Sequence, residues 1–125
     1  MTEFTIQLSN RPGQLAGLAK MLADAGVNIE ALAAFGFEDF GVVRVLVDDA
    51  IAAREVIKEG GLVAEEREVI TTIIRHEPGA LAQLTQSLAD ADVNIDGLYF
   101  LHANSDSIEL ALAVDDPNVA RARIA

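Results

Sequence analysis

The sequence contains one segment twice. Residues 12–35 align without a gap to residues 78–101, and thirteen of the 24 aligned positions are identical. Unrelated segments of this length would share about one or two positions, so a supersecondary unit has been duplicated. Both copies begin with Pro-Gly and run through Leu-Ala-Asp-Ala to Val-Asn-Ile. The chain is therefore expected to fold as two similar modules, and the repeated loop before each helix marks where a ligand could sit.

Hydrophobic periodicity predicts the same run of elements in the first module. Alternating apolar and polar residues indicate a half-buried strand, and an apolar stripe at helical spacing indicates an amphipathic helix. Proline favours the first turn of a helix, and glycine favours its end. The expected elements are a strand at residues 4–8, a helix from Pro12 to Gly26, strands at residues 27–37 and 41–47, and a helix at residues 50–58.

The second half of the chain repeats this order. Residues 62–75 have strand character throughout, so they are expected to hold the last strand of one module and the first strand of the next, broken near Glu65–Glu68. Acidic pairs at Asp48-Asp49 and Asp115-Asp116 precede the second helix of each module and are interpreted as helix caps. The other expected elements are a helix from Pro78, strands at residues 93–101 and 107–114, and the start of a helix at residues 119–125.

These elements predict an α+β fold made of two ferredoxin-like βαββαβ modules in tandem, with antiparallel sheets and helices on one face. The modules are assigned to residues 1–68 and 69–125, and the second lacks its last strand. The sheet edge left by that strand is expected to be open, covered by the neighbouring module, or filled by a partner chain. Modules of about 60 residues bury a limited share of their surface, so a homodimer is expected.

Composition excludes several classes of function. The chain has 9 Lys+Arg against 20 Asp+Glu, a net charge of −11, so it lacks the basic footprint of a nucleic-acid or anionic-membrane binder. It has no cysteine, signal peptide or membrane-length apolar run, which favours the cytoplasm. His76 and His102 are the sole histidines and have no partners at metal-ligand spacing, so no metal or cofactor is expected. Nucleotide-binding and hydrolase motifs are absent as well, and the chain is interpreted as non-enzymatic.

Short motifs in both modules resemble the ACT domain family of regulatory modules. The first module carries Asn-Arg-Pro-Gly-Gln-Leu at residues 10–15, Gly-Val-Asn-Ile at residues 26–29 and Phe-Gly-Val-Val-Arg at residues 40–44. The second carries His-Glu-Pro-Gly-Ala-Leu at residues 76–81 and Asp-Val-Asn-Ile at residues 92–95. The resemblance extends over the whole chain up to the absent last strand.

The resemblance implies a regulatory protein that binds an amino acid and controls amino-acid metabolism. In this family the ligand lies where the loop after the first strand meets the second strand of a neighbouring domain. By resemblance, the chain would be a homodimeric, allosteric amino-acid sensor. The alternative is a regulatory subunit that docks on a separate enzyme, such as an acetolactate-synthase-type chain, with the ligand site secondary or lost.

The chemistry of the repeated loop agrees with that implication. A helix N-terminus offers unpaired N–H groups and a partial positive charge to a carboxylate, and asparagine can donate or accept a hydrogen bond. The candidate ligand-binding residues are Asn10, Pro12, Gly13, Gln14, Leu15, Asn28 and Ile29 in the first module, and His76, Gly79, Ala80, Leu81, Asn94 and Ile95 in the second.

Two alternatives remain open at this point. Pro-Gly after a strand is common in turns that bind nothing, and an asparagine at a strand entry can satisfy the local backbone without touching a ligand. The serine-binding members of the family carry a histidine where this chain has Leu8 and Ile74, and the loop asparagine is replaced by His76 in the second module. Separately, the aromatic residues Phe35, Tyr99 and Phe100 are expected to pack in the core or a dimer interface, or to line a ligand pocket.

Overall fold

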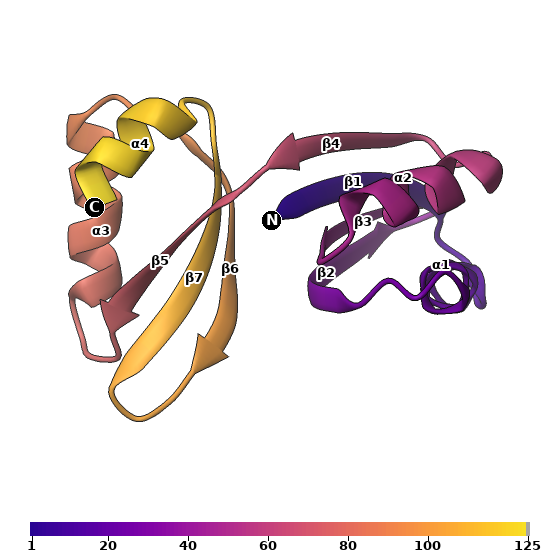
Figure 1. Ribbon diagram of the computed structural model, residues 1–125, viewed down its shortest axis with the longest axis horizontal. Helices are drawn as coiled ribbons and strands as arrows, with labels where there is room; N and C mark the ends of the chain where they lie inside the picture. The colour runs from indigo at the N-terminus through magenta and orange to yellow at the C-terminus, as the bar shows by residue number, and fades with distance from the viewer. Residues whose placement is uncertain (125) are drawn as a thin grey trace. The chain divides into compact units, whose positions relative to one another are not determined.

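The computed structural model describes residues 1–124. The chain divides into two compact units, one formed by Met1–Glu68 and one that starts at Val69 (Figure 1). Each unit combines an antiparallel sheet with two helices, which confirms the predicted α+β class and the tandem of ferredoxin-like modules. Residue 125, the last residue assigned to the final helix, lies outside the described part of the chain.

The first unit has the order β-α-β-β-α-β. Its elements are β1 (Thr2–Ser9), α1 (Gln14–Asp24), β2 (Ile29–Phe37), β3 (Phe40–Val47), α2 (Ala50–Glu59) and β4 (Ala64–Glu68). The sheet order is β2-β3-β1-β4, so β3 is internal, as its apolar and β-branched sequence predicts. Alternate residues of β1 and β3 face the helices, and their side chains form the core with Leu18, Leu22, Ala53 and Ile57.

The second unit repeats the first up to its last strand. Its elements are β5 (Ile70–Arg75), α3 (Ala80–Asp90), β6 (Ile95–Ala103), β7 (Ser107–Val114) and α4 (Pro117–Ile124). The sheet has three strands in the order β5-β7-β6, and within residues 1–124 no strand takes the place that β4 has in the first unit. The core again joins one sheet face to both helices, through Ile70, Leu112, Leu88 and Ala120.

Both first helices begin two residues later than their prolines suggest. Gly13 and Gly79 are the N-cap residues, each with φ of 90°, so helix α1 starts at Gln14 and α3 at Ala80. A left-handed residue cannot lie inside a right-handed helix, so the glycine fixes the start. Pro12 and Pro78 therefore belong to the preceding turns, and their placement in the first helical turn was wrong.

The break between strands β4 and β5 lies just beyond Glu65–Glu68, the stretch where it was predicted. Strand β4 continues through Glu68, and Val69 is the single residue between it and β5. The run of charge at Glu65–Glu68 does not interrupt the strand, because the three glutamates are exposed and Arg67 is only half-buried. Val69 itself is buried.

Candidate functional site

The two repeated loops have nearly the same backbone conformation. The N-cap ψ is −13° at Gly13 and −15° at Gly79, at an identical φ of 90°. Neither helix has a side-chain cap or an acidic residue in its first turn. A Cβ added to either glycine would meet no heavy atom within 4 Å. The glycine is thus required by its φ angle, and open space lies beside each uncapped helix tip.

The backbone donors at these tips are partly engaged by the loop itself. The N–H of Gln14 donates to the Arg11 carbonyl at 3.3 Å, and that of Ala80 donates to Glu77 at the same distance. In α1 the bond from Gly17 to Gly13 is the first turn of the helix. The amides of Leu15 and Ala16 precede that bond, so they and their counterparts Leu81 and Ala82 have no intrahelical acceptor.

The predicted loop residue Asn10 holds a hairpin. Its backbone N–H donates to the Asp39 carbonyl at 2.9 Å, and its side-chain Nδ2 donates to the Glu38 carbonyl at 2.8 Å. The side chain also lies over Gly36, where an added Cβ would come within 2.7 Å of it. Asn10 thereby fixes the loop to the turn between β2 and β3.

His76 takes the backbone role of Asn10 in the second unit and borders a pocket. Its N–H donates to the Asp106 carbonyl at 2.9 Å. A pocket of about 410 Å³ opens beside this loop, large enough for a small ligand. Its walls are the loop residues Arg75, His76, Glu77 and Pro78 together with Ile74, Leu81, Phe100 and Ile108.

Two substitutions between the copies make this second site more apolar than the first. Strand pairing sets Ala34 opposite Val43 in the first unit, where the second sets Phe100 opposite Leu110. Ile108 likewise stands where the first unit has Gly41. The first loop is therefore bordered by small residues at positions where the second has an aromatic ring and a branched chain. Comparison of the two copies could have found this difference, but the first copy alone could not.

The asparagines at the strand entries lie away from the loops. Strand β2 starts beside Val47, whereas the loop follows Ser9, which pairs with Phe40 at the opposite end of the sheet. Seven residues of strand separate the two ends, roughly 20 Å. Neither unit brings its own asparagine to its own loop, so a site that combines them would need a second module.

Each asparagine instead has local partners. Asn28 Nδ2 donates to Glu30 at 3.2 Å, and Asn94 Nδ2 donates to Asp96 at 2.7 Å. Both acceptors lie at an irregularity in the strand register. These contacts support the alternative in which the asparagines satisfy local groups at the strand entries. The neighbouring Ile29 and Ile95 pack against the cores of their units.

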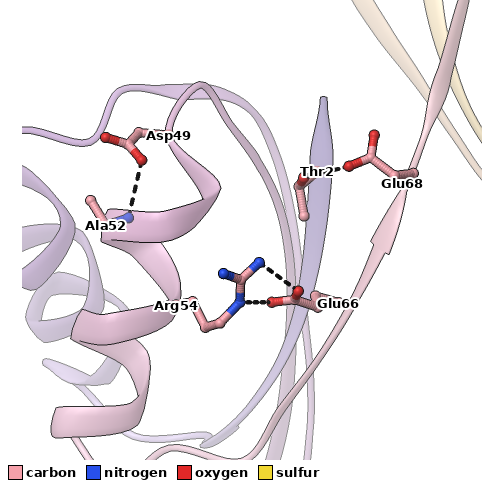
Figure 2. Close-up of polar contacts among 6 residues, drawn as sticks. All are labelled: Thr2, Asp49, Ala52, Arg54, Glu66 and Glu68. Atoms are coloured by element: carbon pink, nitrogen blue, oxygen red, sulfur yellow. Dashed lines mark hydrogen bonds and ion pairs between the residues drawn. The ribbon is translucent and has the colours of Figure 1, made fainter.

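The two aspartates of each acidic pair have different hydrogen-bond partners. Asp49 caps α2 by accepting the Ala52 N–H at 3.0 Å (Figure 2), and Asp116 accepts the Val119 N–H in the same way at 3.1 Å. The preceding Asp48 does not cap the helix but accepts the N–H of Asn28 at 3.0 Å. The prediction that both aspartates of each pair cap the helix was therefore wrong for the first of the two. Asp48 instead joins the entry of α2 to the residue before strand β2.

A bidentate ion pair ties α2 to the outer strand β4. Two guanidinium nitrogens of Arg54 lie 2.7 Å from the two carboxylate oxygens of Glu66 (Figure 2). The hydrogen bond from Arg54 lowers the pKa of Glu66 below its ordinary value. This contact was not predicted, since the two residues are joined by the tertiary fold.

The described residues were also searched for a metal site and a membrane span. Within residues 1–124 no group of three His, Cys, Asp or Glu side chains is placed to hold a metal ion. Over the same range no helix is both long and apolar enough to cross a membrane. Of the aromatic residues, Tyr99 is buried, whereas Phe35 and Phe100 are exposed.

The fold is a tandem of two similar α+β modules, each with the same glycine-capped first helix. The family model described as "ACT domain pair" matches residues 1–125, and the chain belongs to this family. A search of curated proteins found no match.

Solved structures show the same architecture. Protein BT0572 from Bacteroides thetaiotaomicron is similar over 97% of this chain and 83% of its own, with 25% identity and a TM-score of 0.86. The regulatory subunit of aspartate kinase from Thermus thermophilus, in a ligand-free form, is similar over 98% of this chain and 87% of its own, with 18% identity and a TM-score of 0.76. The latter likeness supports the fold alone.

Proposed function

We propose that the chain is a non-catalytic sensor that binds an amino acid at the N-terminal tips of α1 and α3. The observation that carries this proposal is the duplicated glycine N-cap. Both tips keep the same left-handed cap, lack a side-chain cap and face open space. A structural cap has no need for that space, whereas a carboxylate could occupy it and accept the free first-turn amides.

The two tips should favour different ligands. The pocket beside α3 has Phe100, Ile108 and Leu81 in its wall, which suits an amino acid with an apolar side chain. The first loop is bordered by Gly41 and Ala34 and should prefer a smaller or more polar ligand. Charge-assisted hydrogen bonds contribute roughly 1.5–3 kcal/mol each, so two or three give micromolar to millimolar affinity.

We infer that a homodimer completes the sites. Phe37 and Phe40 face each other across the β2–β3 hairpin, and Phe35 lies on the same side of β2. All three are exposed, Phe37 to 76%. An apolar cluster of this kind marks a protein–protein contact, and a second copy could bring the entry of its own β2 to a loop.

A second candidate function uses the same surface. The three phenylalanines could dock the chain on a separate amino-acid biosynthetic enzyme of the acetolactate-synthase type, with the helix tips secondary or unused. Pull-down from a lysate of the source organism distinguishes the two ideas. Recovery of such an enzyme, together with no response to amino acids, would favour the regulatory subunit.

Thermal-shift screening against the twenty amino acids, each at millimolar concentration, tests the sensor. At least one should raise the melting temperature, because a ligand that binds the folded state stabilises it by mass action. Variants Gly13→Ala and Gly79→Ala, each compared with its own ligand-free baseline, should lose the response of one tip. A melting temperature that no amino acid moves would count against the proposal.

A further inference from the structure

A pocket lies inside the first unit between helix α2 and strand β4. Its volume is about 410 Å³, which is within the range of small-molecule sites. Its walls come from Phe4 and from residues 54–66, whereas the candidate loop of the same unit is residues 10–15. The pocket is therefore separate from the helix tip, and the elements on both sides of it belong to one unit.

The floor of this pocket is apolar. Phe4 and Ile57 line it and belong to the core of the unit, with exposures of 2% and 4%. Leu62 and Ala64 extend the apolar wall and pack against the same core. A Cβ added to Gly61, at the end of α2, would meet no heavy atom within 4 Å, so the mouth is open there. An apolar ligand group can therefore leave water against the core.

Two cationic side chains of α2 border the pocket. Arg54 and Lys58 are four residues apart, so they lie on the same face of the helix, one turn from each other. Arg54 donates to Glu66 through Nε and Nη2, both at 2.7 Å, and its Nη1 points away from that carboxylate (Figure 2). The ion pair thus fixes the guanidinium group and leaves the two N–H donors of Nη1 for a ligand.

Lys58 is the uncompensated charge at the rim. Among the ion pairs of residues 1–124, Lys20 and Arg54 have carboxylate partners and Lys58 has none. Successive side chains of a strand point to opposite faces, so Glu65 is directed away from the face on which Glu66 meets α2. Because Arg54 already neutralises Glu66, the rim above the apolar floor is positive, although the chain carries a net charge of −11.

We propose that this pocket binds a monocarboxylate with an apolar body, either a medium-chain fatty acid or a branched-chain 2-oxo acid. The carboxylate accepts hydrogen bonds from Lys58 Nζ and Arg54 Nη1, and charge-assisted bonds of this kind are the stronger ones. The hydrocarbon part covers the core residues Phe4 and Ile57.

The same charges select against a free amino acid. An α-ammonium group would lie beside two cationic side chains, and Glu66, the carboxylate on that side of β4, is engaged by Arg54 at both of its oxygens. The pocket therefore favours an acid without an amino group. This ligand class and this place in the fold both differ from those of the proposed amino-acid sites at the helix tips.

The probes are hexanoate and 4-methyl-2-oxopentanoate, each titrated into the full ¹⁵N-labelled chain. The amide resonances of Gly61 and Leu62, which both line the pocket, should move in a saturable manner with at least one acid. The acid with the lower Kd identifies the source of the carboxylate. 1-Hexanol, which lacks the charge, should bind more weakly than hexanoate.

Replacement of Lys58 tests recognition of the carboxylate. Lys58→Gln should raise the Kd of the tighter acid by about threefold or more, because a charged donor at the rim is lost. Lys58 is exposed, so the variant should fold as the wild type does. Lys20→Gln is the matched control, since Lys20 is the other lysine of the chain and pairs with Asp24 on α1 at 2.9 Å. It should leave the Kd unaltered.

Three results would overturn the proposal. The first is that neither acid moves Gly61 or Leu62 at millimolar concentration. The second is a Kd that Lys58→Gln leaves unchanged, and the third is 1-hexanol binding as tightly as hexanoate, which would reduce the site to apolar contact. Because the probes are not amino acids, failure here would leave the proposed sensor function standing.

Discussion

At the scale of single residues, the two N-cap glycines determine where the helices of the candidate sites begin. Gly13 and Gly79 both have a φ of 90°, which L residues rarely adopt. The repeat predicted both glycines as candidate ligand-binding residues. The structure adds a conformational reason, because the helix start depends on the left-handed turn.

Replacement of Gly13 with alanine should lower the free energy of unfolding by about 1 kcal/mol, through strain at positive φ. Gly17→Ala is the matched control in the same helix. Its added Cβ meets nothing within 4 Å, and alanine favours helix interiors, so it should raise stability by about 0.5–1 kcal/mol. Urea denaturation measures both. Equal effects would show that the cap angle is not what requires glycine.

Glu66 gives the first unit a predictable response to acid. Arg54 lowers the pKa of this carboxylate in the folded chain, so the pair stabilises the fold at pH values above the unfolded pKa of about 4.3. That contribution is lost as the pH falls through the folded pKa. Wild type and Arg54→Ala should therefore differ in stability near pH 7 and converge at low pH. A difference that grows on acidification would contradict this assignment.

At the scale of elements, local signals predicted the helices and strands, and tertiary contacts decided their ends. Asp49 and Gly26 are local signals, and both act near the helix ends where the sequence places them. The irregularity in β6 between Phe100 and His102 leaves no such signal, because it arises from pairing with β7. The pocket beside His76 depends on that pairing too, so the sequence predicted its loop but not its walls.

The caps of the second helices can be tested as elements. Asp49→Ala should cost about 1 kcal/mol because the Ala52 N–H loses its acceptor, whereas Asp49→Ser should cost little. Asp48→Ala should destabilise as well, through loss of the bond to the Asn28 N–H. Chemical denaturation followed by circular dichroism compares the three. An Asp49→Ala variant as stable as wild type would remove the capping role.

At the scale of the whole molecule, the duplicated fold was predictable because the two copies have the same elements in the same order up to the last strand of the first. The sequence could not predict which surfaces would meet a second copy. The exposure of Phe35, Phe37 and Phe40 depends on how the hairpin lies in the fold. The sequence predicted Phe35 in the core, in a dimer interface or in the wall of a ligand pocket, and its exposure excludes the core.

If these phenylalanines form the dimer contact, Phe37→Ser should shift the chain toward monomer. Ile51→Ser is a matched control, because Ile51 is a comparably exposed apolar residue, at 72%, on helix α2. Sedimentation velocity at several concentrations reports the change. A wild-type chain that stays monomeric at high concentration would contradict the proposed homodimer.

The proposed sensor function requires the two helix tips to bind the carboxylate of an amino acid. The most direct measurement is a titration of the ¹⁵N-labelled chain with the amino acid that gives the largest thermal shift, observed through its amide resonances. The resonances of Leu15, Leu81 or both should move in a saturable manner, while the same concentration of ethylamine, which lacks the carboxylate, should move neither. Saturable shifts confined to residues away from both loops would contradict it.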